Sequence, residues 1–228
     1  MKLVSWNCRG LGHSSKTEVV NDLVRMASLD VLMLQETKID EDSLLSTSGK
    51  RWKTNVGKVV SARGTAGGIA TYSFSLENSF TTQHWIFTKL CHIPSKQSIC
   101  LFNLYVPVNI QEKRACWNSL VECLDSNSFS NIIVIGDLNL ILNEKEKSGG
   151  VYGKDPVLKL VDKFILSWEL IDFKPKCGRF TWSNNRLRAA NISARLDHFL
   201  VQSSMLLDKK VISSSILPKI TSDHKPIL

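Results

Sequence analysis

The sequence predicts an α/β fold in which mixed β-sheets pack on each other and helices cover their outer faces. Two observations lead to this fold class. Strand and helix patterns alternate along the first two thirds of the chain, and strand patterns cluster in the final third. The 228 residues are enough to bury a sizeable core, and no repeat, low-complexity run or linker divides them. We therefore expect a single domain over residues 1–228.

Helices are indicated where apolar residues recur every three to four positions. In the first such segment, Val20, Leu23 and Val24 share one face. Before the last, Asp155 suits the N-cap position and Pro156 suits the first turn. The expected helices cover residues 17–29, 111–124 and 156–170.

Strands are indicated by short apolar runs. The run at 132–135 is wholly apolar, as expected of a buried strand, and the run at 99–105 ends before Pro107. The expected strands cover residues 2–6, 31–34, 68–74, 99–105, 132–135, 180–182, 196–201 and 211–216.

Charge and cysteine usage restrict the class of protein. The formal net charge is +8, and a basic protein often meets a polyanion. None of the six cysteines forms a Cys-x-x-Cys pair, so we expect neither a zinc knuckle nor a disulfide framework. Most of the cysteines have apolar neighbours and are expected to be small core residues. No apolar run approaches the roughly 20 residues of a membrane span, and the N-terminus turns polar too early for a secretory signal. We expect an intracellular protein that does not bind a membrane.

Residues 173–196 form a basic segment that contains no Asp or Glu. Such a segment with interleaved aromatic side chains is typical of a surface that contacts a phosphate backbone, although a solvated loop and strand pair explains it equally well. Taken alone, Trp182 is expected in the core, as is Trp6. The candidate DNA contacts are Arg179, Trp182, Arg186 and Arg188.

Polar side chains recur just past the ends of apolar strands. Asn7 follows the first strand, Glu36 follows the second, and Asp137 follows a third. Near the end of the sequence, Asp223 and His224 precede a last apolar run. An α/β scaffold builds an active site by delivering such groups from rigid strands to loops at one edge. We therefore expect these residues to share a cleft.

These residue types suit phosphodiester hydrolysis. The reaction needs a cation to neutralise developing charge, and Mg²⁺ prefers carboxylate oxygens. It also needs a group that orients or deprotonates water and a cationic group near the phosphate. Glu36, Asp137, Asp223 and His224 supply these groups. The sequence has neither a Gly-x-Ser-x-Gly nucleophile elbow nor a phosphate-binding loop of the Gly-x-x-x-x-Gly-Lys type.

Eight short motifs run in a fixed order along the chain. They are Ser5-Trp-Asn-Cys-Arg-Gly10, Leu34-Gln-Glu-Thr37, Gly67-Gly-Ile-Ala70, Leu104-Tyr-Val-Pro107, Gly136-Asp-Leu-Asn139, Phe180-Thr-Trp182, Arg195-Leu-Asp197 and Ser222-Asp-His224. In this order they resemble the endonuclease/exonuclease/phosphatase superfamily, which is DNase I-like. The resemblance implies a four-layer α/β/β/α sandwich of two packed mixed sheets flanked by helices.

The extended motifs around Trp6, Phe180 and Arg195 resemble the endonuclease domains of plant LINE-type non-LTR retrotransposons in particular. The residues before Asp197 differ from those expected of an inositol phosphatase, which disfavours that branch. The resemblance implies a parent polyprotein that continues into a reverse transcriptase. It also implies that the last strand is truncated at Leu228.

For the metal site, the resemblance implies three ligands. Glu36 resembles the main Mg²⁺ ligand, with Mn²⁺ as the alternative cation. Asn7 resembles its neighbour, and Asp223 resembles a second metal-site carboxylate.

For catalysis, the resemblance implies that Asp137 aligns or deprotonates the attacking water. Asn139 and Tyr105 hold the scissile phosphate. Taken alone, Asn139 is also typical of a turn, and Tyr105 is also typical of a half-buried strand residue. His224 stabilises the transition state, and Asp197 orients His224 and keeps it cationic.

The leading hypothesis is a Mg²⁺-dependent endonuclease that nicks DNA and leaves a 3′-hydroxyl to prime reverse transcription. An abasic-site repair endonuclease on the same scaffold is the alternative, because it shares every catalytic residue. A non-catalytic relic that only binds nucleic acid, and a phosphoinositide or sphingolipid hydrolase, are further alternatives. We expect a monomer that resides in the nucleus, with the cytoplasm as the alternative location.

Overall fold

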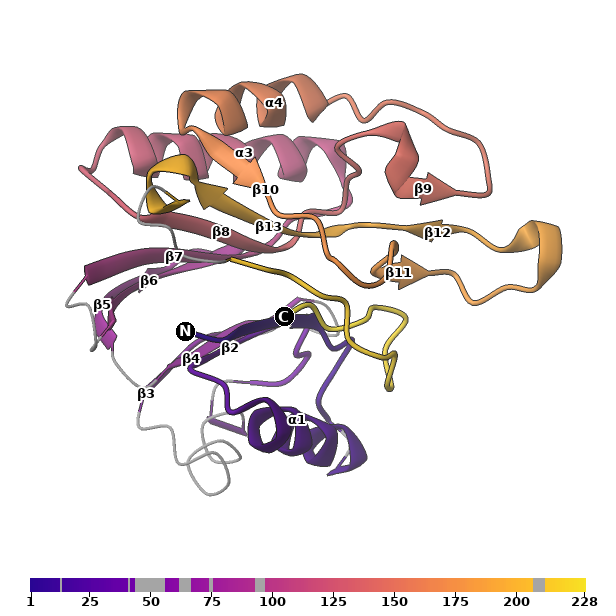
Figure 1. Cartoon of the computed structure of the whole chain (residues 1–228), viewed down its shortest axis with the longest axis horizontal. Coiled ribbons are helices and arrows are strands. Elements are labelled where there is room, and N and C mark those ends of the chain that lie inside the picture. The colour runs from indigo at the N-terminus through magenta and orange to yellow at the C-terminus, as the bar shows by residue number, and fades with distance from the viewer. Residues whose placement is uncertain are drawn as a thin grey trace.

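The computed structural model of the chain has four layers, with helix, sheet, sheet and helix in turn (Figure 1). This arrangement confirms the fold class predicted from the sequence. The structure describes residues 1–12, 14–40, 42–43, 56–61, 67–73, 76–92, 97–206 and 212–228. No helix within these ranges is long and apolar enough to cross a membrane.

The smaller of the two large sheets has four strands in the order β1-β2-β4-β3. These are β1 (Leu3–Asn7), β2 (Val31–Gln35), β4 (Ile69–Ser73) and β3 (Val56–Val60). Strands β1 and β2 are parallel and the other pairs are antiparallel, so the sheet is mixed. Helix α1 (Ser14–Ala27) covers its outer face, where Val20 lies in the same buried cluster as Trp6 and Leu34.

The larger sheet has six strands in the order β10-β13-β8-β7-β6-β5. In chain order they are β5 (Leu76–Thr81), β6 (Trp85–His92), β7 (Gln97–Tyr105), β8 (Ile132–Asp137), β10 (Leu170–Asp172) and β13 (Asp197–Gln202). Only β7 and β8 are parallel. A small third sheet joins β11 (Trp182–Ser183), β12 (Ser193–Ala194) and β9 (Lys147–Ser148).

Helices α3 (Ile110–Asp125) and α4 (Leu158–Ser167) cover the outer face of the larger sheet. Their rings Trp117 and Phe164 lie 5.3 Å apart and pack into the same cluster as Phe102 of β7. The Asn109 side chain caps α3 by accepting the backbone N–H groups of Gln111 and Glu112. Three short 3-10 turns complete the described structure, η1 (Glu144–Glu146), η2 (Arg188–Ala190) and η3 (Ser203–Leu206).

The layer between the two large sheets changes from apolar to polar along the strands. Because side chains alternate between the two faces of a strand, every second residue points into this layer. In β2, Met33 belongs to the apolar cluster between the sheets, and Gln35 follows it on the same face. In β8, Ile135 is followed in the same way by Asp137. The fold therefore places polar side chains at one end of an otherwise apolar interface.

A buried hydrogen-bond network links the sheets at this polar end. Gln35 of β2 donates to Ser5 of β1 at 3.0 Å and to Asn103 of β7 at 2.6 Å. The Asn103 amide group in turn donates to the Ala70 carbonyl and the Thr71 hydroxyl of β4 at 3.0 Å each. Since buried polar groups are costly when unpaired, this network restricts how the sheets slide against each other.

Several predicted elements need correction. The third helix begins at Leu158, and Asp155 is not its N-cap, although its carboxylate accepts the backbone N–H of Val157 at 2.9 Å. Within 212–216, only Ile216 makes a bridge, to Ile227, so the described part of the predicted strand at 211–216 is not a strand. Position 211, like position 74 of the predicted strand at 68–74, lies outside the described residues.

Some elements were not predicted at all, namely β3, β5, β6, β9, β10 and β12. Among the cysteines, Cys8, Cys100 and Cys116 are buried, Cys91 and Cys123 are partly buried, and Cys177 is exposed.

Gly136 permits the close pairing that brings Asp137 to the site. It lies in β8 at φ +140°, and a Cβ atom there would stand 2.0 Å from the Leu104 carbonyl oxygen of β7. The clashing atom belongs to the backbone of β7, which cannot move aside as a flexible side chain could.

We predict that Gly136→Ala lowers the free energy of unfolding by about 3 kcal/mol, because it combines backbone strain with a steric clash. Urea denaturation would measure the change. Gly153→Ala is the matched control, since nothing lies within 4 Å of a Cβ atom at that position. Equal stability of the two variants would contradict the close approach described here.

Candidate active site

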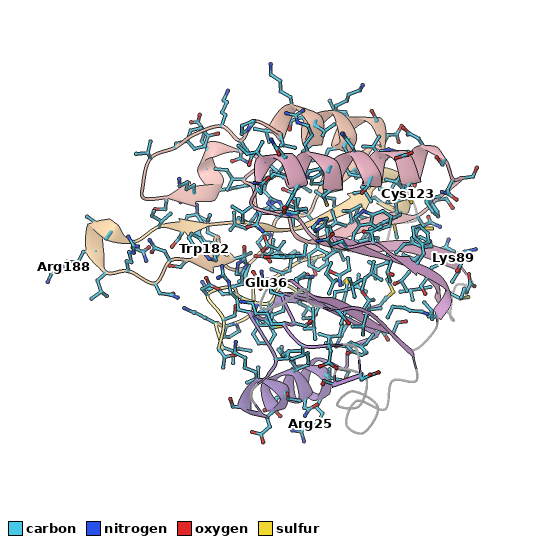
Figure 2. The ribbon with its side chains drawn as sticks, turned by 180° about the vertical axis from the view of Figure 1, so that it is seen from behind. Arg25, Glu36, Lys89, Cys123, Trp182 and Arg188 are labelled. Atoms are coloured by element: carbon cyan, nitrogen blue, oxygen red, sulfur yellow. The ribbon has the colours of Figure 1, made fainter. Side chains whose placement is uncertain are left out.

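The candidate site residues gather at the polar end of the two large sheets. Asn7 ends β1, Glu36 follows β2, Tyr105 ends β7, Asp137 ends β8 and Asp197 begins β13. The C-terminal segment adds Asp223 and His224 through the bridge that His224 forms with Trp182 of β11. Figure 2 shows Glu36 in the interior between the two halves of the molecule.

Glu36 is held in one orientation by both its backbone and its side chain. It has φ +49°, and its carbonyl accepts the backbone N–H of Gly10 at 2.6 Å. Its carboxylate accepts a hydrogen bond from Asn7 at 3.0 Å and lies 3.6 Å from Arg9 and 3.3 Å from Lys38. Burial disfavours the charged form, but the Asn7 hydrogen bond and the Arg9 charge outweigh it and lower the pKa of Glu36. Glu36 is therefore a carboxylate at neutral pH.

Asp223 faces the same point as Glu36. Its Oδ1 atom lies 3.0 Å from the Arg9 Nε atom, and its Oδ2 atom accepts a hydrogen bond from Trp182 at 2.9 Å. One cationic side chain thus already bridges the two carboxylates. The two carboxylate groups offer oxygen ligands, which suit a hard divalent cation. The Asn7 side chain turns its amide nitrogen to Glu36 and its amide oxygen to the Arg9 backbone N–H, at 3.2 Å. Glu36 and Asp223 are therefore the residues that fit such a cation, and Asn7 orients Glu36 beside them.

Asp137, His224 and Asp197 form a buried chain beside this point. The His224 Nδ1 atom lies 2.9 Å from Asp197, and its Nε2 atom lies 3.7 Å from Asp137. Burial disfavours the imidazolium, but the charges of Asp197 and Asp137 outweigh it and raise the pKa of His224 to about 9. Burial also raises the pKa of Asp137, against the lowering effect of His224. The arrangement supplies a fixed cation next to an unusually basic carboxylate.

Tyr105 and Asn139 border the same site. The Tyr105 hydroxyl hydrogen-bonds to Glu36, and burial together with the Glu36 charge raises its pKa, so it is a neutral donor. Asn139 has φ +48°, and its backbone N–H donates to Asp137 at 3.0 Å. The Asn139 side chain donates to the Val106 carbonyl at 2.7 Å, so in this structure it fixes the loop as a turn residue would.

Three residues that the sequence did not single out position this site. The Ser222 hydroxyl donates to the Asn7 carbonyl at 2.8 Å and accepts the backbone N–H of His224 at 3.1 Å. The buried Thr181 hydroxyl accepts the backbone N–H of Asp197 at 3.2 Å. Lys113 donates to the Asn139 carbonyl at 2.9 Å. Ser222 and Thr181 lie inside two of the eight sequence motifs, which could have indicated them. Nothing in the sequence indicates Lys113.

The predicted DNA contacts do not all lie free on the surface. Arg186 and Arg188 are exposed in the loop between β11 and β12, and Figure 2 shows Arg188 at its outer tip. Arg179 is exposed but donates to the Lys145 carbonyl at 2.8 Å and stacks over Phe180. Trp182 is half-buried, and its indole N–H donates to Asp223. The expectation that Trp182 lies in the core is therefore wrong.

The basic segment also contains a structural residue. Arg195 is buried and pairs with Asp172 and, at 3.3 Å, with Glu146, while its Nη2 atom lies 2.8 Å from His198. Glu146, Asp172 and His198 therefore form an acid-rich cluster around a guanidinium, with no need for a metal. Arg195 does not belong to a surface that binds phosphate.

The fold and this set of groups define an enzyme that hydrolyses phosphoesters. A family model described as Endonuclease/Exonuclease/phosphatase family matches residues 4–224. The chain belongs to this family, whose members depend on a divalent metal. It is therefore a hydrolytic enzyme of the endonuclease/exonuclease/phosphatase class.

Solved structures with the same fold cover nearly all of this chain. An AP endonuclease from Archaeoglobus fulgidus has 19% identity and a TM-score of 0.76, covering 100% of this chain and 97% of that one. A 3′ phosphatase, NExo from Neisseria, bound to a product DNA hairpin has 19% identity and a TM-score of 0.75, with the same coverage. The AP endonuclease LMAP from Leishmania major has 20% identity and a TM-score of 0.74, covering 99% of this chain and 85% of that one. No curated protein matches the chain by sequence.

We predict that His224 titrates with a pKa near 9, because Asp197 and Asp137 stabilise its charged form. The unfolded-state pKa of histidine is about 6.5, and a higher pKa in the folded state stabilises the fold. This stabilisation is complete below about pH 6.5 and is lost as the pH rises through the folded-state pKa. NMR titration of the imidazole would give the pKa, and unfolding at pH 6.5 and pH 9 would give the stability change.

Asp197→Asn should lower the pKa of His224, whereas Asp162→Asn on the exposed face of α4 should leave it unchanged. A His224 pKa close to 6.5 in the unaltered protein would show that the two carboxylates do not hold the proton.

Proposed function

We propose that this protein is a Mg²⁺-dependent endonuclease that nicks DNA. The observation that carries the proposal is the Asn7 amide group, which donates to Glu36 at 3.0 Å and to Asp137 at 2.8 Å. One side chain thus joins the carboxylate that suits a cation to the carboxylate that suits an attacking water. Phosphodiester hydrolysis needs those two groups side by side.

Each group has a separate part in the reaction. Asp137, with its raised pKa, aligns a water molecule and accepts its proton as the water oxygen bonds to phosphorus. The imidazolium of His224 and the hydroxyl of Tyr105 donate to the phosphate oxygens, which gain charge in the transition state. A divalent cation held by Glu36 and Asp223 would neutralise further charge on the phosphate, and Asn7 would keep Glu36 in place for it. The phosphorus–O3′ bond breaks, and the 3′ oxygen leaves with a proton from water.

The loop between β11 and β12 supports DNA as the substrate. Its two strands lead away from the site, since Trp182 bridges to His224 at one end and the loop projects beyond the body of the molecule at the other (Figure 1). Arg186, Leu187 and Arg188 are exposed there. A cationic loop beside a phosphodiesterase site suits a long polyanion better than a small phosphate ester.

The motifs around Trp6, Phe180 and Arg195 support a finer proposal, that the enzyme is of the non-LTR retrotransposon type and leaves a 3′-hydroxyl primer. A DNA target of this kind places the protein in the nucleus. Abasic-site cleavage is the competing activity, because every catalytic group would be the same.

We predict that the protein nicks supercoiled plasmid with Mg²⁺ and not with EDTA, and that Glu36→Gln lowers the rate at least ~100-fold by removing a carboxylate ligand. Glu77→Gln is the matched control, since Glu77 is an exposed acid paired with Lys89. Agarose gel electrophoresis would follow conversion to the open circle. Nicking that survives Glu36→Gln would overturn the assignment of the site.

The same preparation would separate the competing activities. Intact and abasic duplexes should be cut at similar rates if the retrotransposon type is correct, and a strong abasic preference would favour the repair type. Binding without cleavage by folded protein would favour the non-catalytic alternative. Release of phosphate from inositol polyphosphates would favour a phosphatase.

We also predict that Arg188→Gln weakens DNA binding and reduces the slope of log affinity against log salt by about 1, because one phosphate contact is lost. Arg25→Gln on α1 is the control, since Arg25 lies on the far side of the smaller sheet (Figure 2). Fluorescence anisotropy at several salt concentrations would measure both slopes. An unchanged slope in Arg188→Gln would remove the loop from the binding surface.

A further inference from the structure

Arg9 lies over the candidate metal site although it is not one of its ligands. Its Nε atom lies 3.0 Å from Asp223 and 3.6 Å from Glu36, so the guanidinium occupies the space that the two carboxylates share. Its positive charge also acts on Tyr105 across the site. A cation therefore already sits where the family's divalent metal fits.

The backbone of Arg9 is held by hydrogen bonds, whereas its side chain is held by ion pairs and is partly exposed. Its N–H donates to the Asn7 side chain at 3.2 Å, and its carbonyl accepts from Lys16 at 2.9 Å. The flanking Cys8 and Gly10 donate their backbone N–H groups to the carbonyls of Gln35 and Glu36. The Arg9 side chain is nevertheless 44% exposed, so it has room to turn about a rigid base.

We propose that Arg9 is a built-in counter-ion of the metal site, which competes with the divalent cation for Glu36 and Asp223 and turns to a substrate phosphate once the cation displaces it. The inference rests on the proposed function, since it takes these two carboxylates as metal ligands. Arg9 thus has two roles. It acts on the metal site as a positioning residue, and after displacement it contacts the substrate.

Competition follows from the charges. Without a cation, two carboxylates facing one point repel each other, and Arg9 and Lys38 relieve that repulsion. A divalent cation carries more charge into the same space and meets a like charge in the guanidinium. Binding of the cation therefore costs the two Arg9 ion pairs, each a partly exposed pair of modest strength.

The displaced guanidinium is well suited to phosphate. Its planar set of N–H donors matches two phosphate oxygens at once, which a lysine cannot reproduce. Because the Arg9 backbone stays fixed next to Asn7, the turned side chain remains beside the scissile position. Metal loading and substrate contact are thus coupled through one residue.

The test compares Mn²⁺ binding, by isothermal titration calorimetry without DNA, in the full chain and in Arg9→Gln, Arg9→Lys, Arg25→Gln and Glu36→Gln. Arg9→Gln should bind Mn²⁺ about threefold to tenfold more tightly, because the competing ion pairs are gone. Arg9→Lys keeps the charge and should stay near the unaltered protein, and Arg25→Gln controls for net charge. Thermal unfolding would confirm that each variant is folded.

A second readout separates competition from simple structural damage. In an Asp137→Asn background, which prevents cleavage, and at saturating Mn²⁺, Arg9→Gln should weaken binding to a DNA duplex by about threefold to tenfold, and Arg25→Gln should not. A purely structural role for Arg9 would weaken both metal and DNA binding. Opposite changes in the two affinities support the proposal.

The failures are distinguishable. Mn²⁺ binding that is lost in Glu36→Gln but equal or weaker in Arg9→Gln would overturn the counter-ion role and leave the metal site standing. Mn²⁺ binding that persists unchanged in Glu36→Gln would overturn the metal site itself, and the role of Arg9 with it.

Discussion

The Asn7 side chain connects the two sheets at the point where the chemistry is expected. It leaves the end of β1 and donates to Glu36, which follows β2 in the same sheet, and to Asp137, which ends β8 in the other sheet. An amide that serves two carboxylates requires both sheets to keep one relative position. The Gln35–Asn103 network just below supplies that restraint, and the apolar cluster beyond it supplies the burial free energy.

This constraint also separates the two carboxylates chemically. Glu36 keeps a low pKa because cations and Asn7 surround it, whereas burial raises the pKa of Asp137. Two acids whose pKa values are pushed apart take different roles, one as a permanently charged ligand and one as a proton acceptor. His224 retains its positive charge because Asp197 supports it from the side away from Asp137. Glu36, Asp137 and His224 thus have pKa values shifted in different ways within one site.

Much of this was readable from the sequence. The strand that ends at Asp137 is apolar along its length and polar at its end. Such a pattern predicts a buried interface with a polar group at its edge. Strands β3, β5 and β6, which have five to eight residues, were nevertheless missed. The helices, the buried strands β1, β2 and β8, and the meeting of Asn7, Glu36 and His224 followed from that pattern. The short strands β9, β10 and β12 did not, because two or three residues carry no periodicity and pair only through tertiary contacts.

Charged residues were the harder part of the prediction. Arg195 and Arg188 belong to one basic segment, yet the first is buried against Asp172 and the second is exposed in a loop. Burial depends on partners far along the chain, and local sequence does not name them. For the same reason the sequence does not single out Arg9, because its significance lies in facing Glu36 and Asp223 together.

The central claim is that the divalent cation binds at Glu36 and Asp223, and not at the buried histidine clusters. Anomalous diffraction from crystals soaked in Mn²⁺ would test it directly, since the metal would appear as a peak in the anomalous map. We expect that peak beside Glu36, within reach of Asp223. A peak among Asp137, Asp197 and His224, or among Glu146, Asp172 and His198, with none at Glu36, would contradict the assignment.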